Sequence, residues 1–427
     1  MPNFSIALSG LNADSQALNT IANNLSNMNA TAYKEKTTNF ADMFYQSIGS
    51  TGSGNPIQVG AGTKIASTST NYTQGSSNTT NTSSSDMEIA GNGFFVVSDG
   101  SQNYLTRNGQ FTQNTSGYLE TSSGDKLMGY AATNGVISST SLSPIEIPTA
   151  GTVMAPSAST EMTISCNLNS ATAVNGSFSS TTKLYDTQGT EHSATITYTK
   201  TATDTWSYSI SLPNSDYTSG TSTPITGSFA FDASGNLSTV TYGSPASTST
   251  VGTAAGNVSS IPVSFTGLSD GASNLSMKWN LLDTSGNQII GQVASANNAK
   301  SSIADGYAAG IYDSFAVDSD GKVRASYKNG QTMVIGQVAV ADVANEQGLS
   351  SLGSSLYKTT TSSGDANIGI AGTGSLGTVT DSALEQSNVD ISTEFANLII
   401  AQRAFEANSK SITTFDTVTQ QAIGMIR

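Results

Sequence analysis

Few residues in this sequence of 427 amino acids have the types and spacing that catalysis or metal binding requires. His192 is the single histidine, so the sequence offers no zinc-type histidine cluster. It lies in an alternating strand pattern next to a turn, where we expect an exposed residue at a strand edge rather than the base of a Ser-His-Asp relay. The one cysteine, Cys166 in "MTISCNL", cannot form an internal disulfide and is expected to be a small buried side chain.

Two glycine-containing segments formally resemble ligand loops. "GTGSLG" at 372–377 matches a dinucleotide fingerprint, but that motif requires a preceding strand and a following helix, and here a glycine-rich loop precedes it. "DSDGK" at 318–322 has its glycine fourth rather than sixth, which favours a hairpin turn over a calcium loop, and "KNG" at 328–330 predicts another turn. Trp206 and Trp279 fit a core as well as a sugar-binding platform, and carboxylate pairs for glycoside hydrolysis stay open because their spacing is set in three dimensions. We predict no catalytic residue, no cofactor and no metal site.

Composition and charge exclude further classes of protein. The formal net charge is -14 and no Lys/Arg stripe interrupts it, so a nucleic-acid partner is not expected. Only 11% of residues are charged, 41 are glycine, and Ser, Thr and Asn are abundant, which is typical of a turn-rich, extracellular-type β protein. No stretch approaches the roughly 20 apolar residues of a membrane span. No basic residue precedes Lys34 and no apolar h-region is present, so we expect no membrane insertion and no cleavable secretory signal.

Two amphipathic segments lie near the two ends of the chain. The residues and loops discussed above all lie between these segments in the sequence. Apolar residues recur at intervals of seven in each segment, which predicts two helices with a coiled-coil seam, and Asp14 alone is out of pattern. Asp381 and Ser382 are candidate N-caps of the second helix, with Glu385 completing a possible capping box. An ordinary antiparallel helical hairpin that covers a domain fits the pattern equally well. The expected seam consists of Phe4, Leu11, Leu18, Ile21, Leu25, Met28, Ile391, Phe395, Leu398, Phe405, Ile412 and Phe415.

Period-two alternation with Gly, Asn and Asp at hairpin distances predicts β structure between the helices. We therefore predict a multidomain, mainly β protein whose discontinuous β domains are threaded on an α-helical coiled-coil domain formed by the N- and C-terminal segments. In the linker, Phe40, Phe44 and Tyr45 are expected to anchor on a neighbouring subunit or on their own chain, the alternative being a floppy linker with locally docked aromatics. The expected parts are 1–30 with 385–427 as the terminal helical domain, 31–84 as an extended linker arm, 85–148 with 299–375 as an inner β domain, 149–298 as an inserted outer β domain, and 376–384 as a connecting segment.

Five segments resemble the signature segments of the flagellar rod, hook and hook-associated axial proteins. They are "ANNLSNMNATAYKEKTTNFADMFYQ", "GNGFFVVSDG", "YLTRNGQFTQNTSGYL", "GQVAVADVANEQGLSSLGSSLY" and "LEQSNVDISTEFANLIIAQRAFEANSKSI". Ala32 and Tyr33 stand where the family often has Gly-Phe, and Phe405 where Tyr is common, which we interpret as volume-tolerant changes. The middle segment "TTKLYDTQGTEHSATITYTK" is similar to the inserted outer domain that hook subunits carry and the shorter distal-rod subunits lack.

The resemblance implies a structural subunit rather than an enzyme. It implies self-assembly into a curved helical tube that transmits torque from the motor rod to the filament as a flexible universal joint. It also implies an extracellular position in the hook region of the flagellum, reached through the flagellar export apparatus. The implied partners are other copies, a hook cap scaffold, the distal rod protein and the hook–filament junction proteins. Two alternatives stay open, a distal-rod subunit and a secreted β-rich glycan-binding or adhesive protein, although the second leaves the paired terminal heptads unexplained.

Overall fold

The structure, a computed structural model, describes residues 4–43, 46–50, 56–80, 82–138, 140–243 and 245–425; the side chains of 4, 46–48 and 56–59 are not described. The chain divides into two compact units. Unit 1 comprises Met1–Thr149, Ser314–Ser326 and Thr332–Arg427, and unit 2 comprises Ala150–Asp313 and Tyr327–Gln331. Among the described residues, no helix combines the length and the apolar character that crossing a membrane would need.

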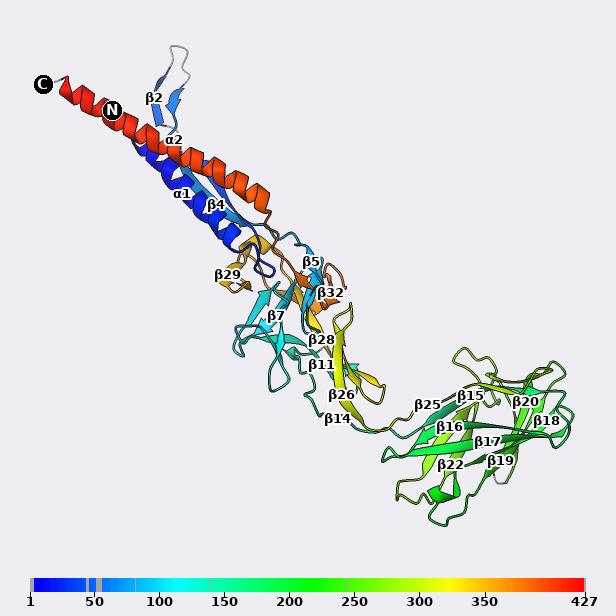
Figure 1. Cartoon of the computed structure of the whole chain (residues 1–427). Helices are drawn as coiled ribbons and strands as arrows, with labels where there is room; N and C mark the ends of the chain where they lie inside the picture. Colours follow the sequence, from blue (N-terminus) through cyan, green and yellow to red (C-terminus); the bar gives the residue numbers. More distant parts are fainter. Residues whose placement is uncertain are drawn as a thin grey trace. The chain divides into compact units, whose positions relative to one another are not determined.

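The two ends of the chain meet in unit 1 as a pair of antiparallel helices, α1 (Phe4–Ser26) in blue and α2 (Ile391–Gly424) in red (Figure 1). The predicted fold class, mainly β with packed terminal helices, is therefore confirmed. The predicted N-cap is wrong, because α2 begins only after Asp390, whose side chain accepts a hydrogen bond from the Thr393 amide at 2.7 Å. Asp381 instead ends a strand, and Glu385 has another role described below.

The segment 31–84, expected to be a single extended arm, folds back on itself beside the helices. Strand β1 (Lys36–Asp42) pairs antiparallel with β4 (Thr63–Thr70), and both strands contact α1. A second hairpin joins β2 (Gln46–Ser50) to β3 (Pro56–Val59). The Thr20 and Thr38 hydroxyls lie 2.9 Å apart, which ties α1 to β1. Pairing of the two strands satisfies the backbone groups that face each other, which a lone extended arm could not do within its own chain.

Ala32 has φ 55° and is fully buried, at the turn between α1 and β1. This left-handed conformation costs an L-residue roughly 1–2 kcal/mol and costs glycine nothing comparable. The glycine that we expect in the family at this position would adopt this conformation more readily, so the change to Ala32 affects the backbone conformation as well as the side-chain volume.

Most of the remaining strands of unit 1 belong to one large sheet, in which β28 pairs with β27, β11, β7 and β31. Two separate two-stranded sheets join β6 to β32 and β5 to β33. The core of the large sheet includes three rings in edge-to-face contact, those of Tyr72, Phe94 and Tyr357, with centroids 5.8–6.0 Å apart. The strands are β5 (Ser77–Asn78), β6 (Met87–Ala90), β7 (Phe94–Ser98), β8 (Asn103–Thr106), β9 (Thr112–Gln113), β10 (Leu119–Glu120), β11 (Lys126–Thr133), β12 (Val136–Ile137), β13 (Ser143–Pro144), β27 (Lys322–Tyr327), β28 (Thr332–Asp342), β29 (Ser350–Gly353), β30 (Leu356–Lys358), β31 (Asn367–Ile370), β32 (Thr378–Asp381) and β33 (Leu384–Glu385), with the 3-10 turn η2 (Glu346–Gly348).

Unit 2 is a β-sandwich of a six-stranded antiparallel meander, β16 to β21, and a mixed sheet in which β15 pairs with β23, β24 and β25. Alternate residues of each strand point into one shared core, where Trp206 and Trp279 are fully buried, so neither forms a sugar-binding platform. The elements are β14 (Val153–Met154), β15 (Glu161–Asn169), β16 (Ser177–Tyr185), β17 (Glu191–Ala202), β18 (Thr205–Ser211), η1 (Asn214–Asp216), β19 (Ile225–Phe231), β20 (Leu237–Tyr242), β21 (Ser247–Thr250), β22 (Ser260–Phe265), β23 (Leu275–Asn280), β24 (Ile290–Val293), β25 (Asn298–Ala304) and β26 (Gly310–Val317), the last of which leads back into unit 1.

Unit 2 extends past residue 298, where we had placed the end of the inserted domain. The reason is that β25 pairs with β15 from Asn298 to Ala304 and so completes the mixed sheet. The turns predicted at 318–322 and 328–330 are confirmed, since the Gly321 and Gly330 amides donate to carbonyls three residues earlier and both glycines have positive φ. The segment 372–377 joins β31 to β32 directly. The helix that a dinucleotide-binding loop would have to open is therefore not formed there.

Candidate assembly surface and its supporting network

The terminal helices approach closely where small residues meet. Ala7 and Ala13 of α1 and Ala401 of α2 are buried, and a Cβ added to Gly10 would lie 2.8 Å from Nδ2 of Asn408. That same Nδ2 donates to Oδ2 of Asp14 at 2.8 Å. Asp14, the one residue out of pattern in the heptad, is thus the acceptor of a hydrogen bond between the two helices.

The structure places most residues of the predicted seam half-buried in the helix layer. They are Leu11, Leu18, Ile21, Leu25, Met28, Leu398, Phe405, Ile412 and Phe415. Ile391 and Phe395 differ, because they are 46% and 49% exposed on the outer face of α2. Phe44 and Tyr45 lie outside the described residues, as does the side chain of Phe4.

An exposed apolar stripe runs along the first turns of α2, and sequence periodicity identified only half of it. Ile391, Phe395 and Ile399 follow one another at intervals of four residues, so they line one side of the helix. Ile399 is 57% exposed and the next residue, Ile400, is 66% exposed. The unbroken apolar run "LIIA" at 398–401 was the available signal, because a helix with one buried face needs fewer consecutive apolar residues. Ile400 lies about 100° further round the helix than Ile399 and lines a groove beside α1; together with Ile391, Phe395 and Ile399 it makes up what we call the α2 stripe.

Phe40, the one linker anchor whose side chain is described, is 47% exposed and lines a groove of about 320 Å³ beside α1 and α2. The groove also contains the carboxyl groups of Asp14, Glu35 and Glu394. Glu394 is 3% exposed, and its Oε2 has no hydrogen-bond partner among the described residues. Burial, followed by contact with the Glu35 carboxyl, raises the pKa of Glu394 above its ordinary value of 4.5.

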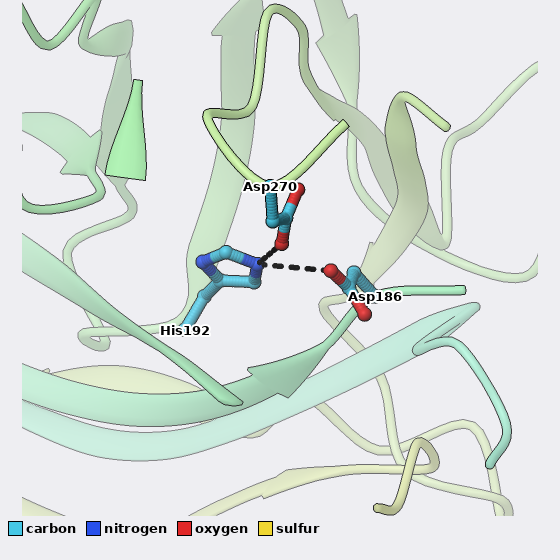
Figure 2. A group of neighbouring side chains, drawn as sticks. All are labelled: Asp186, His192 and Asp270. Carbon is cyan, nitrogen blue, oxygen red and sulfur yellow. Dashed lines mark hydrogen bonds and ion pairs between the residues drawn. The ribbon is translucent and has the colours of Figure 1, made fainter. Parts of the chain in front are cut away.

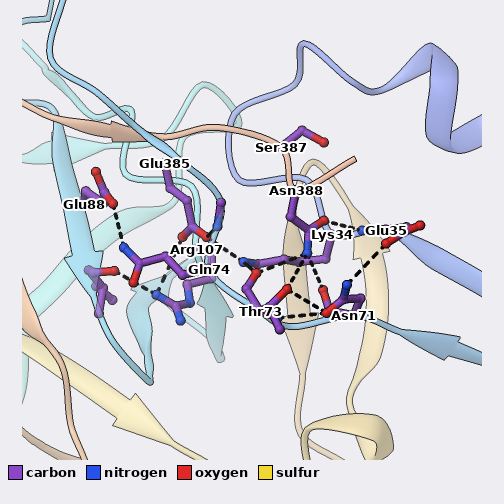
Figure 3. A network of polar contacts seen from close by, with 12 residues as sticks. Lys34, Glu35, Asn71, Thr73, Gln74, Glu88, Arg107, Glu385, Ser387 and Asn388 are labelled. Carbon is purple, nitrogen blue, oxygen red and sulfur yellow. Dashed lines mark hydrogen bonds and ion pairs between the residues drawn. The ribbon is translucent and has the colours of Figure 1, made fainter. Parts of the chain in front are cut away.

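A buried ion pair fixes the entry to this helix layer. Nζ of Lys34 lies 2.6 Å from Oε1 of Glu385, and neither side chain is exposed (Figure 3). Oε1 also accepts the Gly75 amide at 2.9 Å, and Nη1 of Arg107 stands 3.6 Å from Oε2. Burial lowers the pKa of Lys34, and the Glu385 carboxylate opposes that shift. The cluster is a closely paired set of charges in a site without water access.

Asn388, three residues beyond Glu385, connects the same segments through its amide. Its Oδ1 accepts the Glu35 amide at 2.8 Å, and its Nδ2 donates to the Asn71 carbonyl at 2.8 Å (Figure 3). Asn24, buried near the end of α1, pairs in the same manner with the backbone of Lys36 through both of its amide atoms. The signature segments that are far apart in the sequence therefore converge on one network, which holds α1, β1 and the start of α2 in register.

His192 is not the exposed strand-edge residue that we predicted, because it is 3% exposed on β17 among three aspartates. Cys166 is buried as expected, and burial raises the pKa of its thiol to about 11, so it is not a reactive thiolate.

Comparisons with known proteins agree with this architecture. Four family models match, described as flagella basal body rod protein (residues 4–34), flagellar hook protein FlgE/F/G D1 domain (88–167), flagellar basal body protein FlaE D2 domain (176–307) and flagellar basal body rod FlgEFG protein C-terminal (380–425). These matches agree with a helix pair that is built from both chain ends and carries discontinuous β units. Together they define an axial protein of the bacterial flagellum.

Relatives that match over nearly their full length show which kind of axial protein this chain resembles. The flagellar hook proteins FlgE of Escherichia coli K12 and Salmonella typhimurium LT2 are each 33% identical over 99% of both chains, and that of Borreliella burgdorferi is 29% identical over 97%. The chain belongs to the flagellar hook protein family, a family of structural proteins. The crystal structure of Helicobacter pylori flagellar hook protein FlgE2 is similar in fold, with a TM-score of 0.54 at 14% identity, covering 74% of this chain and all of that chain.

Proposed function

We propose that this protein is the repeating subunit of a flagellar hook and that it polymerises through its terminal helix layer into a curved tube. The observation that carries the proposal is the α2 stripe, whose four large apolar side chains are exposed beside a half-buried seam. Soluble monomers rarely leave contiguous apolar surface of this kind uncovered. The occupant is a second copy of this chain, because the family match covers the full length and the family is that of the hook.

Burial of the apolar surface that the helices leave exposed would drive assembly. Fully burying an Ile or Phe side chain contributes roughly 1.5–3 kcal/mol, and the stripe residues are about half covered already. Each contact is therefore weak alone and becomes sufficient only when repeated by several neighbours. A head-to-tail contact whose rotation does not close a ring extends into a helical tube. The predicted seam residues, Leu18 and Leu398 among them, would position the stripe from within the subunit.

The outer surface of unit 2 supports a second part of the proposal, that subunits slide past one another as the tube bends. Hydroxyl pairs lie on its outward faces at 2.9–3.0 Å, formed by Ser179 with Thr197, Thr241 with Thr248, and Ser264 with Ser276. Such groups exchange partners with water at little cost, whereas ion pairs would fix one register. A universal joint that transmits torque needs both the rigid inner layer and this exchangeable outer contact.

The proposal extends to location and partners. As a hook subunit the chain would lie outside the cell, having passed through the flagellar export apparatus. It would meet a cap scaffold at the growing end, the distal rod protein below and junction proteins above. A distal-rod role is disfavoured because the match to the FlaE D2 domain occupies 176–307. The linker aromatic Phe40, which lies on β1, would contact a neighbouring subunit.

Negative-stain imaging of the concentrated protein after addition of sulfate, which strengthens apolar burial, tests the assembly surface. The wild-type chain is expected to form curved tubes and Ile399→Asp to remain monomeric with an unchanged far-UV CD spectrum. Val174→Asp is the matched control, since Val174 in unit 2 is 56% exposed against 57% for Ile399. Normal tubes from Ile399→Asp would contradict the assignment of the α2 stripe, and straight tubes from the wild type would favour a rod subunit.

A further inference from the structure

Three aspartates surround His192 in unit 2, on segments that are separate in the sequence. His192 lies in β17, Asp186 in the turn between β16 and β17, Asp216 at the end of η1, and Asp270 in the loop between β22 and β23. His192 and Asp186 are buried, whereas the side chain of Asp270 is 21% exposed. The assembly surface on the helices does not involve this cluster.

Each of two carboxylates is held by the backbone through one oxygen and directs the other toward the imidazole. Oδ1 of Asp186 accepts the amides of Gln188 and Thr190, both at 2.8 Å. Oδ1 of Asp270 accepts the amide of Ala272 at 2.9 Å. Their Oδ2 atoms both face Nε2 of His192, and both lie 3.5 Å from it (Figure 2).

These two distances fit shared coordination better than hydrogen bonding. A good hydrogen bond from a ring nitrogen to an oxygen is about 2.7–3.2 Å long, and one N–H shared between both carboxylates would make only a three-centre bond with two long, weak components. Two ligand atoms of a tetrahedral Zn²⁺ ion, each bonded at about 2.0–2.1 Å, stand roughly 3.4 Å apart. One ligand atom from each of Asp186, His192 and Asp270 lies within 4.8 Å of the others, so a single ion can contact all three.

The remaining aspartate completes the arrangement expected around a metal-binding histidine. Oδ2 of Asp216 lies 2.8 Å from Nδ1 of His192. When Nδ1–H donates to this carboxylate, the lone pair of Nε2 is directed at the space between Asp186 and Asp270, as in carboxylate–histidine–zinc triads. Three carboxylates would leave a net charge of -2 even around a protonated imidazole, and a divalent cation offsets that charge.

We propose that Asp186, His192 and Asp270 form a binding site for a divalent transition metal ion, best suited to Zn²⁺, with Asp216 as the residue that positions the imidazole. One imidazole nitrogen and two carboxylate oxygens are ligands that Zn²⁺ accepts, and the partial exposure of Asp270 provides an entry path and room for a water ligand. The ion would join the β16–β17 turn to the loop between β22 and β23 and so stabilise unit 2. This inference departs from our expectation that the chain has no metal site.

The test is equilibrium dialysis of the EDTA-treated, full-length protein against Zn²⁺, together with unfolding followed by tryptophan fluorescence. Both tryptophans, Trp206 and Trp279, lie in unit 2, so the fluorescence reports this unit alone. We expect one equivalent of Zn²⁺ and a higher unfolding midpoint with the ion than with EDTA. Asp216→Asn should weaken binding 10- to 100-fold, the usual effect of losing the partner of a ligating histidine.

Asp270→Asn, which preserves the size and the acceptor for Ala272, should abolish both the binding and the shift in midpoint. Asp283→Asn is the matched control, because Asp283 accepts the Ser285 and Asn287 amides in a turn of the same unit but has no histidine partner. It should bind like the wild type. Absence of stoichiometric binding at submillimolar Zn²⁺, or equal binding by Asp270→Asn, would overturn the proposal without affecting the proposed role in the hook.

Discussion

Oε1 of Glu385 lies 2.6 Å from Nζ of Lys34, although 351 positions separate the two residues in the sequence. Lys34 follows the first helix and Glu385 precedes the second. The pair therefore joins the two chain segments that lead out of α1 and into α2. The Ala32 amide, which donates to the Glu385 carbonyl at 2.8 Å, reinforces the junction. The helix layer is therefore coupled to the β core of unit 1 through buried charges.

Lys34→Met is expected to destabilise unit 1 strongly, because it leaves the buried Glu385 carboxylate with the Gly75 amide and the more distant Arg107 guanidinium, 3.6 Å away, but without its closest cation. Removing one partner of a buried pair typically costs about 3–5 kcal/mol. Both described helices lie in unit 1 and both tryptophans in unit 2, so urea unfolding can separate the units. The transition seen by CD at 222 nm should move to lower urea while the fluorescence transition stays in place.

The control for this prediction is Lys183→Met, which removes an exposed ion pair with Glu191 in unit 2. Exposed pairs contribute little, so both transitions should stay where they are. An unchanged CD transition in Lys34→Met would show that the network does not support the helix layer.

The buried carboxyl of Glu394 predicts that the helix layer loses stability as the pH rises. Its pKa in the folded protein lies above the ordinary value of 4.5, so the folded state retains a proton that the unfolded state releases. By linkage, the contribution of this carboxyl to stability is fully present below pH 4.5 and is lost as the pH rises through the raised folded pKa. Glu394→Gln, which stays neutral, should flatten this dependence and be the more stable protein at pH 7, as measured by CD-monitored unfolding across pH 4–8.

Glu406→Gln provides the comparison, since Glu406 is an exposed glutamate on the same helix. Its pH dependence should match that of the wild type. If Glu394→Gln and the wild type showed parallel curves, the proton would not be held at this carboxyl.

The close approach of Gly10 to Asn408 predicts a non-additive pair of substitutions. Gly10→Ala gains about 1 kcal/mol of helix propensity, but its Cβ would displace the Asn408 side chain and break the bond to Asp14. In an Asn408→Ala background the gain in helix propensity remains, because no Asn408 side chain is left to be displaced. Gly10→Ala should therefore stabilise the helix layer by about 1 kcal/mol in that background and little or not at all in the wild type. Equal effects in both backgrounds, measured by urea unfolding, would exclude the contact.

Local patterns were sufficient for the two helices and the hairpin turns, but not for the paired strands within 31–84 or for the partners of each element. The heptads predicted both helices because periodicity is a property of neighbouring residues, and the hairpin turns followed from glycines placed where positive φ is needed. The N-cap was misplaced because Ser382 and Glu385 satisfy a capping pattern locally while Glu385 is engaged by Lys34 from the other end of the chain. His192 was misjudged for the same reason, since its aspartate partners at 216 and 270 are distant in sequence.

The sequence by itself determined the class of the protein: two apolar heptad segments at the ends, a mainly β interior low in charge, and signature segments typical of flagellar axial proteins. Only the tertiary structure decided which apolar residues face the helix pair and which, such as Ile399, remain uncovered. It also decided that the signature residues Lys34, Arg107 and Glu385 form one buried network. Burial and pairing depend on contacts between segments hundreds of residues apart, and local periodicity carries no information about those contacts.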